Sequence, residues 1–149
     1  MAYIITNAGE KRILSGGLGM AGAEIGSITA SLITSALTFT ATMTLTSVTH
    51  LTAGRAGGDN SKCSAVLSGS AWSDVPFLQA GYMTVSATGV GLRFQFTAAP
   101  NASAIGYALW DDSNLYVVET FTDGPYYLSN AGDTVTVTPY IKLGSGTFN

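Results

Sequence analysis

The chemistry open to this chain is limited by its single histidine, His50, and its single cysteine, Cys63. Nucleophilic catalysis requires a base held beside the nucleophile, and His50 is the only histidine that could serve Cys63 or a serine. The sequence contains no G-x-S-x-G turn, and one histidine with one cysteine cannot complete a closed zinc shell. We therefore expect a structural histidine, a small buried cysteine and a protein that is not an enzyme and needs no cofactor or metal.

Two further motifs suggest ligand sites but stand in the wrong context. Residues 17–22 match G-x-G-x-x-G, yet the dinucleotide fingerprint requires a preceding strand and a following helix, and a glycine-rich arm is favoured here. Residues 111–114, with Asp59 and Asn60 elsewhere, offer oxygen ligands for calcium. They lack the alternating spacing and terminal glutamate of a calcium loop, so a plain turn is favoured.

Exposed aromatic side chains are the third kind of group that could bind a ligand, because they can stack on sugar rings. The tyrosines and tryptophans concerned are Trp72, Tyr82, Trp110, Tyr116, Tyr126, Tyr127 and Tyr140. Their apolar bodies and polar tips suit core edges and protein interfaces as well as glycans. Core or interface positions are favoured. Glycan binding stays open as the alternative, with Trp72, Trp110, Tyr116, Tyr126 and Tyr127 as the platform.

The elements that would position these groups are mostly strands. Period-two alternation or apolar runs predict strands at 28–34, 37–46, 82–85, 92–97, 104–110, 115–121 and 133–143, with a hairpin turn at 111–114. Loops are predicted at 52–62 and 71–76. Leu92, Phe94 and Phe96 should face the core, as should Val135, Val137, Ile141 and Leu143. Pro139 cannot donate to a ladder, so its strand is expected to lie at an edge or to bulge there.

Threonine occupies every even position from Thr38 to Thr46, which predicts a hydroxyl-bearing face on that strand. β-Propensity explains such a pattern, and an array that orders water against ice is the less favoured alternative. Together the strands predict a mainly β fold, an antiparallel, jelly-roll-like β-sandwich with one short N-terminal helix.

That helix is predicted over residues 8–14, with Asn7 as its N-cap and Glu10 as the reciprocal partner. Residues 1–27 would form the helix and a glycine-rich arm, residues 28–143 the sandwich and residues 144–149 a flexible tail. The apolar tip formed by Tyr3, Ile4 and Ile5, together with Arg12, is expected to contact neighbouring chains. Deleting residues 1–5 is then expected to leave a folded domain that no longer assembles.

Length, charge content and net charge restrict the classes of protein to which this chain can belong. The 149 residues suit one domain, and charged residues are 10% of the chain, against about 25% in typical proteins. A surface so poor in charge fits an extracellular protein or one embedded in an assembly. With a net charge of −3 and no cluster of Lys or Arg, nucleic acid is not an expected partner. No signal peptide or membrane-span pattern is seen, so exit from the cell would occur by another route, such as lysis.

The C-terminal part contains three distinctive segments: Gly106-Tyr107-Ala108-Leu109-Trp110-Asp111, then Glu119 and Phe121, then Gly132-Asp133-Thr134-Val135-Thr136-Val137-Thr138-Pro139. In this order they resemble a family of small virion proteins of tailed bacteriophages. The opening Thr6-Asn7-Ala8-Gly9-Glu10 is also similar to that family's start. The chain departs from the family at 37–46, where a proline-containing polar loop is usual.

The resemblance implies a virion component, most plausibly a capsid decoration or accessory protein that binds the head lattice. Its partners would be the major capsid protein or a tail protein and copies of itself, as a closed homo-oligomer such as a trimer. It would assemble in the host cytoplasm and be released by lysis. The alternative is a tail or head-fibre adhesin that binds host surface glycan.

Overall fold

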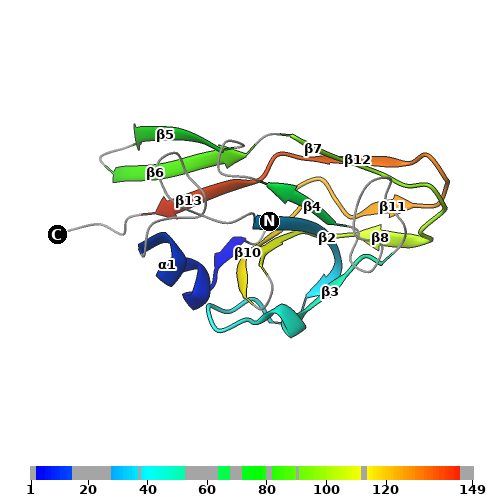
Figure 1. Cartoon of the computed structure of the whole chain (residues 1–149), viewed down its shortest axis with the longest axis horizontal. Coiled ribbons are helices and arrows are strands. Elements are labelled where there is room, and N and C mark those ends of the chain that lie inside the picture. Colours follow the sequence, from blue (N-terminus) through cyan, green and yellow to red (C-terminus); the bar gives the residue numbers. More distant parts are fainter. Residues whose placement is uncertain are drawn as a thin grey trace.

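The computed structural model describes residues 3–14, 28–36, 38–52, 64–67, 72–79, 82–89, 91–111 and 114–144. These residues are mainly in strands (Figure 1). The strands are β1 (Tyr3–Ile5), β2 (Ile28–Ala36), β3 (Val48–His50), β4 (Ser64–Leu67), β5 (Trp72–Gln79), β6 (Tyr82–Gly89), β7 (Leu92–Gln95), β8 (Ala102–Ala104), β9 (Gly106–Trp110), β10 (Leu115–Thr120), β11 (Tyr126–Leu128), β12 (Thr134–Val137) and β13 (Tyr140–Gly144). The helices are α1 (Asn7–Leu14) and the short 3₁₀ helix η1 (Leu45–Ser47).

All of the described strand pairs are antiparallel. The largest sheet has the order β1-β10-β9-β2-β3, and β4 pairs with the first half of β2 on the same side as β3. The smaller sheets are β11-β8, β12-β7 and β13-β6-β5. In Figure 1, β5, β6, β7, β12 and β13 run along one side of the molecule and β2, β3 and β10 lie on the other. The prediction of a mainly β, antiparallel, sandwich-like fold with one short α-helix is confirmed.

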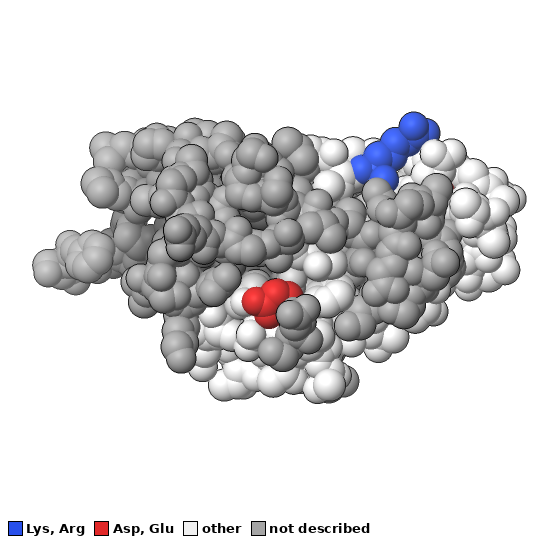
Figure 2. Space-filling view, viewed as in Figure 1, with Lys and Arg blue, Asp and Glu red and all other residues white. Residues whose placement is uncertain are grey.

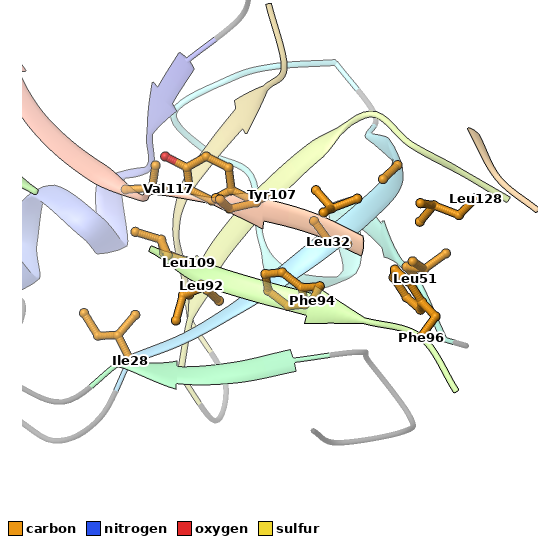
Figure 3. Close-up of a cluster of buried hydrophobic side chains, with 14 of the residues drawn as sticks. Ile28, Leu32, Leu51, Leu92, Phe94, Phe96, Tyr107, Leu109, Val117 and Leu128 are labelled. Atoms are coloured by element: carbon orange, nitrogen blue, oxygen red, sulfur yellow. The ribbon is translucent and has the colours of Figure 1, made fainter. Parts of the chain in front are cut away.

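The main core lies between the large sheet and the β7-β12 ribbon. Leu92, Phe94 and Phe96 are buried while Arg93 and Gln95 between them are exposed, so the predicted inward face is confirmed. Figure 3 shows these three side chains gathered with those of β2 and β9. The same alternation holds along β12, where Val135 and Val137 are buried and the threonines between and before them are exposed.

Strands β9 and β10 bury both of their faces, which explains why their sequences are continuous apolar runs. On one face Tyr107, Leu109 and Val117 belong to the main core. On the other, Ala108 and Val118 belong to a second cluster, which includes Met43 and Val48. The predicted hairpin of 104–110 and 115–121 is therefore confirmed, and it forms the central layer of the domain.

The strand predicted over 37–46 is wrong, because the described residues from 38 to 46 form bends, turns and the start of η1. Threonine side chains bond to each other locally instead, Thr40 to Thr42 at 3.1 Å and Thr44 to Thr46 at 3.0 Å. Such short-range bonds compete with a sheet ladder. Of the apolar residues that were expected to share a buried face, Met43 is buried and Ala41 is exposed. The flat hydroxyl array needed for ice binding is thus not formed.

The loop predicted at 71–76 is also wrong, because β5 begins at Trp72 and runs through Pro76. In the order β13-β6-β5 this strand lies at the edge of its sheet, where a missing proline N–H is tolerated. The single strand predicted over 133–143 is divided at Pro139, where an edge position or a bulge was expected. Pro139 lies in the break between β12, which pairs with β7, and β13, which pairs with β6.

The N-terminal helix is confirmed, but its cap lies one residue earlier than predicted. The Gly9 amide donates to Thr6 Oγ1 at 3.1 Å, and the Glu10 amide donates to the Thr6 carbonyl at 2.9 Å. Thr6 is therefore the N-cap in place of Asn7. The Asn7 amide instead donates to the Ala41 carbonyl at 2.7 Å, which ties the helix start to the 38–46 segment.

The predicted apolar tip is not directed away from the sandwich. Tyr3, Ile4 and Ile5 form β1, which pairs with Glu119, Val118 and Val117 of β10. Tyr3 and Ile5 pack against the main core. Alternating apolar residues with β-propensity can complete a sheet edge as readily as dock on a partner, and here the sheet edge is completed.

Several predictions fall outside the described residues: the arm at 16–26, most of the loop at 52–62, Cys63 and the tail after Gly144. Within the described ranges, no helix is long and apolar enough to cross a membrane.

Candidate functional site

A polar cluster joins β2, β3 and β9 through Ser31 and Trp110, which are buried, and His50, which is half-buried. Ser31 Oγ lies 2.7 Å from His50 Nδ1 and accepts a hydrogen bond from Trp110 Nε1 at 2.8 Å. The His50 and Trp110 rings meet edge to face, with centroids 5.7 Å apart. Ser31 thus satisfies the polar atoms of two aromatic side chains where β9 and β3 flank the same strand.

A serine beside a histidine is half of a hydrolase site. Whether the Ser31 hydroxyl is accessible therefore decides whether it could act as a nucleophile. Ser31 is 0% exposed, and its hydroxyl is closed in by Trp110 and His50. A nucleophile must reach a substrate carbonyl, which this hydroxyl cannot do in the folded chain. The cluster is therefore a structural network that fixes the registers of β3 and β9 on β2.

Replacing Ser31 with alanine is expected to destabilise the fold by about 1–3 kcal/mol, because two buried polar groups lose their partner. Urea unfolding monitored by tryptophan fluorescence would measure the loss. Ser35 lies exposed on the same strand, so Ser35→Ala is the matched control and should change stability by less than about 0.5 kcal/mol. Equal losses in both variants would contradict the role assigned to the network.

Two other polar contacts organise the β9-β10 hairpin. Tyr107 donates to the Glu119 carboxylate, which is only 6% exposed, and the two residues face each other across the ladder. At the turn, Asp111 Oδ1 accepts from the amide and side chain of Asn114, each at 3.2 Å, and Tyr116 donates to Asp111 Oδ2. Asp111 and Asn114 thus behave as turn residues, as predicted. Among the described residues, no three His, Cys, Asp or Glu side chains are grouped as a metal site.

A groove with ligand-sized dimensions lies along β11 and the turn after it. Its volume is about 410 Å³. The lining residues are Pro125, Tyr126, Tyr127, Leu128, Ser129, Asn130, Asp133 and Thr134. Strand β11 pairs only with β8 among the described strands, so this ribbon lies outside the large sheet. The residues combine an aromatic wall with amide, hydroxyl and carboxylate groups.

Alternation along β11 gives its two tyrosines different roles. Leu128 is buried, and Tyr126 leans the same way to meet the Phe121 ring at 5.1 Å. Tyr127 points to the opposite side and is 65% exposed. Asp133 fixes the following turn, because its Oδ2 accepts from the amides of Ser129 and Asn130, both at 2.9 Å. The groove is therefore built on a backbone that is already ordered.

A hydrogen bond to Asp123, with smaller contributions from burial and from the Asp123 charge, raises the pKa of Tyr126 above its ordinary value of 10.0. Because the folded-state pKa is the higher one, this contribution to stability is complete below pH 10 and is lost as the pH rises through the raised value. Asp123→Asn should move the pKa of Tyr126 back toward its ordinary value. NMR titration of labelled tyrosine rings would measure this shift. Thr134→Ala, an uncharged change in the same groove, should leave that pKa unchanged.

The structure separates the aromatic residues that were predicted as a possible glycan platform. Trp110 and Tyr116 are 7% and 3% exposed, so both are core residues, as the favoured interpretation predicts, and neither belongs to the alternative glycan platform. Their neighbours in the sequence are apolar on both sides, which is typical of a strand buried on both faces. Tyr126 is half-buried against Phe121, whereas Tyr127 is exposed on the opposite face of β11. Trp72, Tyr82 and Tyr140 are placed in β5, β6 and β13 by their backbones.

The residues that were predicted to form an interface also lie apart from that groove. Tyr3, Ile4 and Ile5 form the edge of the large sheet, and Arg12 lies in α1. Sequence reasoning missed Ser31, Glu119 and Asp133 as organising residues. Ser31 and Glu119 stand within apolar runs, where a polar residue signals a buried hydrogen bond. Asp133 follows Gly132, whose φ of +92° marks the turn that this aspartate stabilises.

Comparisons of the chain with protein-family models, with curated proteins and with solved structures find no match. Function is therefore inferred from the residues of the chain itself and from the resemblance described above.

Proposed function

We propose that this protein is a structural component of a tailed-phage virion, a capsid decoration or accessory protein that binds the head lattice. The observation that carries the proposal is a charge-poor surface on a mainly antiparallel β domain. On the described part of the face in Figure 2, blue and red atoms occupy small separate areas among white ones. Charged residues make up 10% of the whole chain.

The exposed positions of the described strands and turns are rich in hydroxyl groups. Thr134, Thr136 and Thr138 alternate on the outer face around β12, and Thr40, Thr42, Thr44 and Thr46 are exposed in the segment before η1. Hydroxyl surfaces desolvate at lower cost than charged ones and can hydrogen-bond to a partner's backbone. Such a surface suits permanent contact with other proteins.

The partners would be the major capsid protein or a tail protein, together with copies of this chain in a closed ring such as a trimer. Strand β1 is the end strand of the described sheet, and Ile4 points to the side opposite Tyr3 and Ile5. Ile4 at this edge and Arg12 of α1 remain the proposed contacts. Localisation would be the virion, assembled in the host cytoplasm and released by lysis.

Mass spectrometry of purified, intact particles tests the proposal. We expect peptides of this chain in virions, in a fixed ratio to the major capsid protein. Complete absence of the chain from intact particles, with the protein present in the infected lysate, would overturn the structural role.

A further inference from the structure

We propose that the groove beside Tyr127 is a binding site for a neutral carbohydrate, with the exposed tyrosine ring as the stacking surface. The site lies away from the proposed contacts at β1, but it borders the threonine face of β12, because Thr134 belongs to both. Its walls come from β11 and from the turn held by Asp133.

Tyr127 provides the apolar part of the site. Among the described residues it is the large hydrophobic side chain that stands exposed, at 65%. A tyrosine combines an apolar ring face with a polar hydroxyl, which suits stacking on the apolar face of a sugar ring beside hydrogen-bonding groups. Its strand is paired to β8, with Tyr127 opposite Ser103, so the backbone that carries the ring is fixed. With the backbone fixed, only the two side-chain torsions of the tyrosine are ordered on binding, so the entropy cost is small.

The polar part of the site surrounds this ring. The Asn130 side chain donates to Ser129 Oγ at 3.0 Å, and Asp133 holds both residues through their amides. The amide of Asn130 and the carboxylate of Asp133 can pair with vicinal hydroxyl groups, which donate and accept in the same plane. A volume of about 410 Å³ is within the size range of small-molecule sites.

The charge of the lining selects a neutral sugar over an acidic one. Asp133 lines the groove, Asp123 lies against Tyr126, and none of the described lining residues is Lys or Arg. A carboxylate facing a sialic acid or a phosphate would repel it, whereas it accepts hydrogen bonds from neutral hydroxyls. A peptide segment is the other occupant that could cover Tyr127, but the groove lining is predominantly polar.

Saturation-transfer NMR on the full chain tests this site, with methyl galactoside, methyl glucoside and N-acetylglucosamine as neutral probes and sialyllactose as the acidic one. We expect at least one neutral probe to bind with a Kd on the order of 1 mM. Tyr127→Ala should weaken that binding about tenfold or more, whereas Tyr127→Phe, which keeps the ring, should retain most of it. Because Tyr127 is exposed, both variants should unfold at the wild-type temperature.

Thr136→Ala is the matched control, since this exposed residue of β12 is not part of the lining, and it should leave binding unchanged. The proposal is overturned if no neutral probe binds at about 10 mM, a concentration that would reveal even weak sites. It is also overturned if sialyllactose binds as well as the neutral probes, or if Tyr127→Ala has no effect on sugar binding. Loss of particle incorporation in Tyr127→Ala, without any sugar binding, would identify a protein contact instead.

Discussion

Gly106→Ala is expected to destabilise the protein by about 3 kcal/mol or more, which is a large part of the stability of a domain this size. Gly106 lies at the start of β9, between β2 and β10. A Cβ at this position would overlap the Glu119 carbonyl oxygen and lie 2.8 Å from Thr120 Cα. These are backbone atoms of the paired strand, so the only relief is to open the β9-β10 ladder in the centre of the fold.

Urea unfolding would measure the loss, and Gly91→Ala is the matched control. A Cβ on Gly91 would meet only Thr138 Oγ1 at 3.7 Å and Thr136 Cγ2 at 3.9 Å, which are ordinary contacts. That variant should stay within about 0.5 kcal/mol of the wild type, or gain slightly from a stiffer unfolded chain. If Gly106→Ala were as stable as Gly91→Ala, the backbones of β9 and β10 would not approach each other as closely at Gly106 as the structure shows.

The strands that could be predicted from the sequence are those whose burial leaves a regular pattern of apolar residues. Where one face of a strand is buried and the other faces solvent, as at Phe94 and Val135, apolar and polar residues alternate along the sequence. This alternation predicts the strand correctly. Continuous apolar runs around Leu109 and Val117 also identify strands, because a hairpin turn separates them. In each case packing and propensity act in the same direction.

Prediction failed where local hydrogen bonds or tertiary pairing decided the structure. The alternation from residue 38 to 46 is as regular as that of β12, yet the threonine hydroxyls bond to near neighbours and the chain turns. Among the described strands, none pairs with this segment to favour the extended form. Conversely, Trp72 to Pro76 contains residues typical of a loop, but pairing with β6 makes them a strand.

The candidate site was only partly predictable, because exposure depends on which face of a strand meets the core. The sequence grouped four tyrosines and tryptophans of the described surface and core without separating them: Tyr127 is exposed, Tyr126 is half-buried, and Trp110 and Tyr116 are buried. The support that Asp133 gives to the groove depends on bonds to Ser129 and Asn130 across a turn. Turn geometry of this kind is set by the folded backbone, and residue type alone does not specify it.

The second large effect concerns the N-terminal strand. Deleting residues 1–6 is expected to destabilise the fold by about 4 kcal/mol or more, contrary to the expectation that the sequence alone supports. Tyr3 and Ile5 pack on the core, and the deletion would expose what they cover. Thr6 is 0% exposed, and its hydroxyl donates to the Leu115 carbonyl while its amide donates to the Tyr116 carbonyl at 2.9 Å. Without Thr6 these two buried acceptors on β10 lose their donors, and α1 loses its cap.

Circular dichroism and urea unfolding of the deletion variant would measure this effect, and two point variants separate its causes. Thr6→Val keeps the side-chain shape but removes the hydroxyl, so it should lose about 1–3 kcal/mol through the unpaired carbonyl and the missing cap. Ile4→Thr keeps β-propensity on the face turned away from Tyr3 and Ile5, so it should lose much less. If the deletion variant folds with wild-type stability, β1 is not part of the cooperative domain. If Ile4→Thr folds normally but is excluded from virions, the edge at β1 is a lattice contact as proposed.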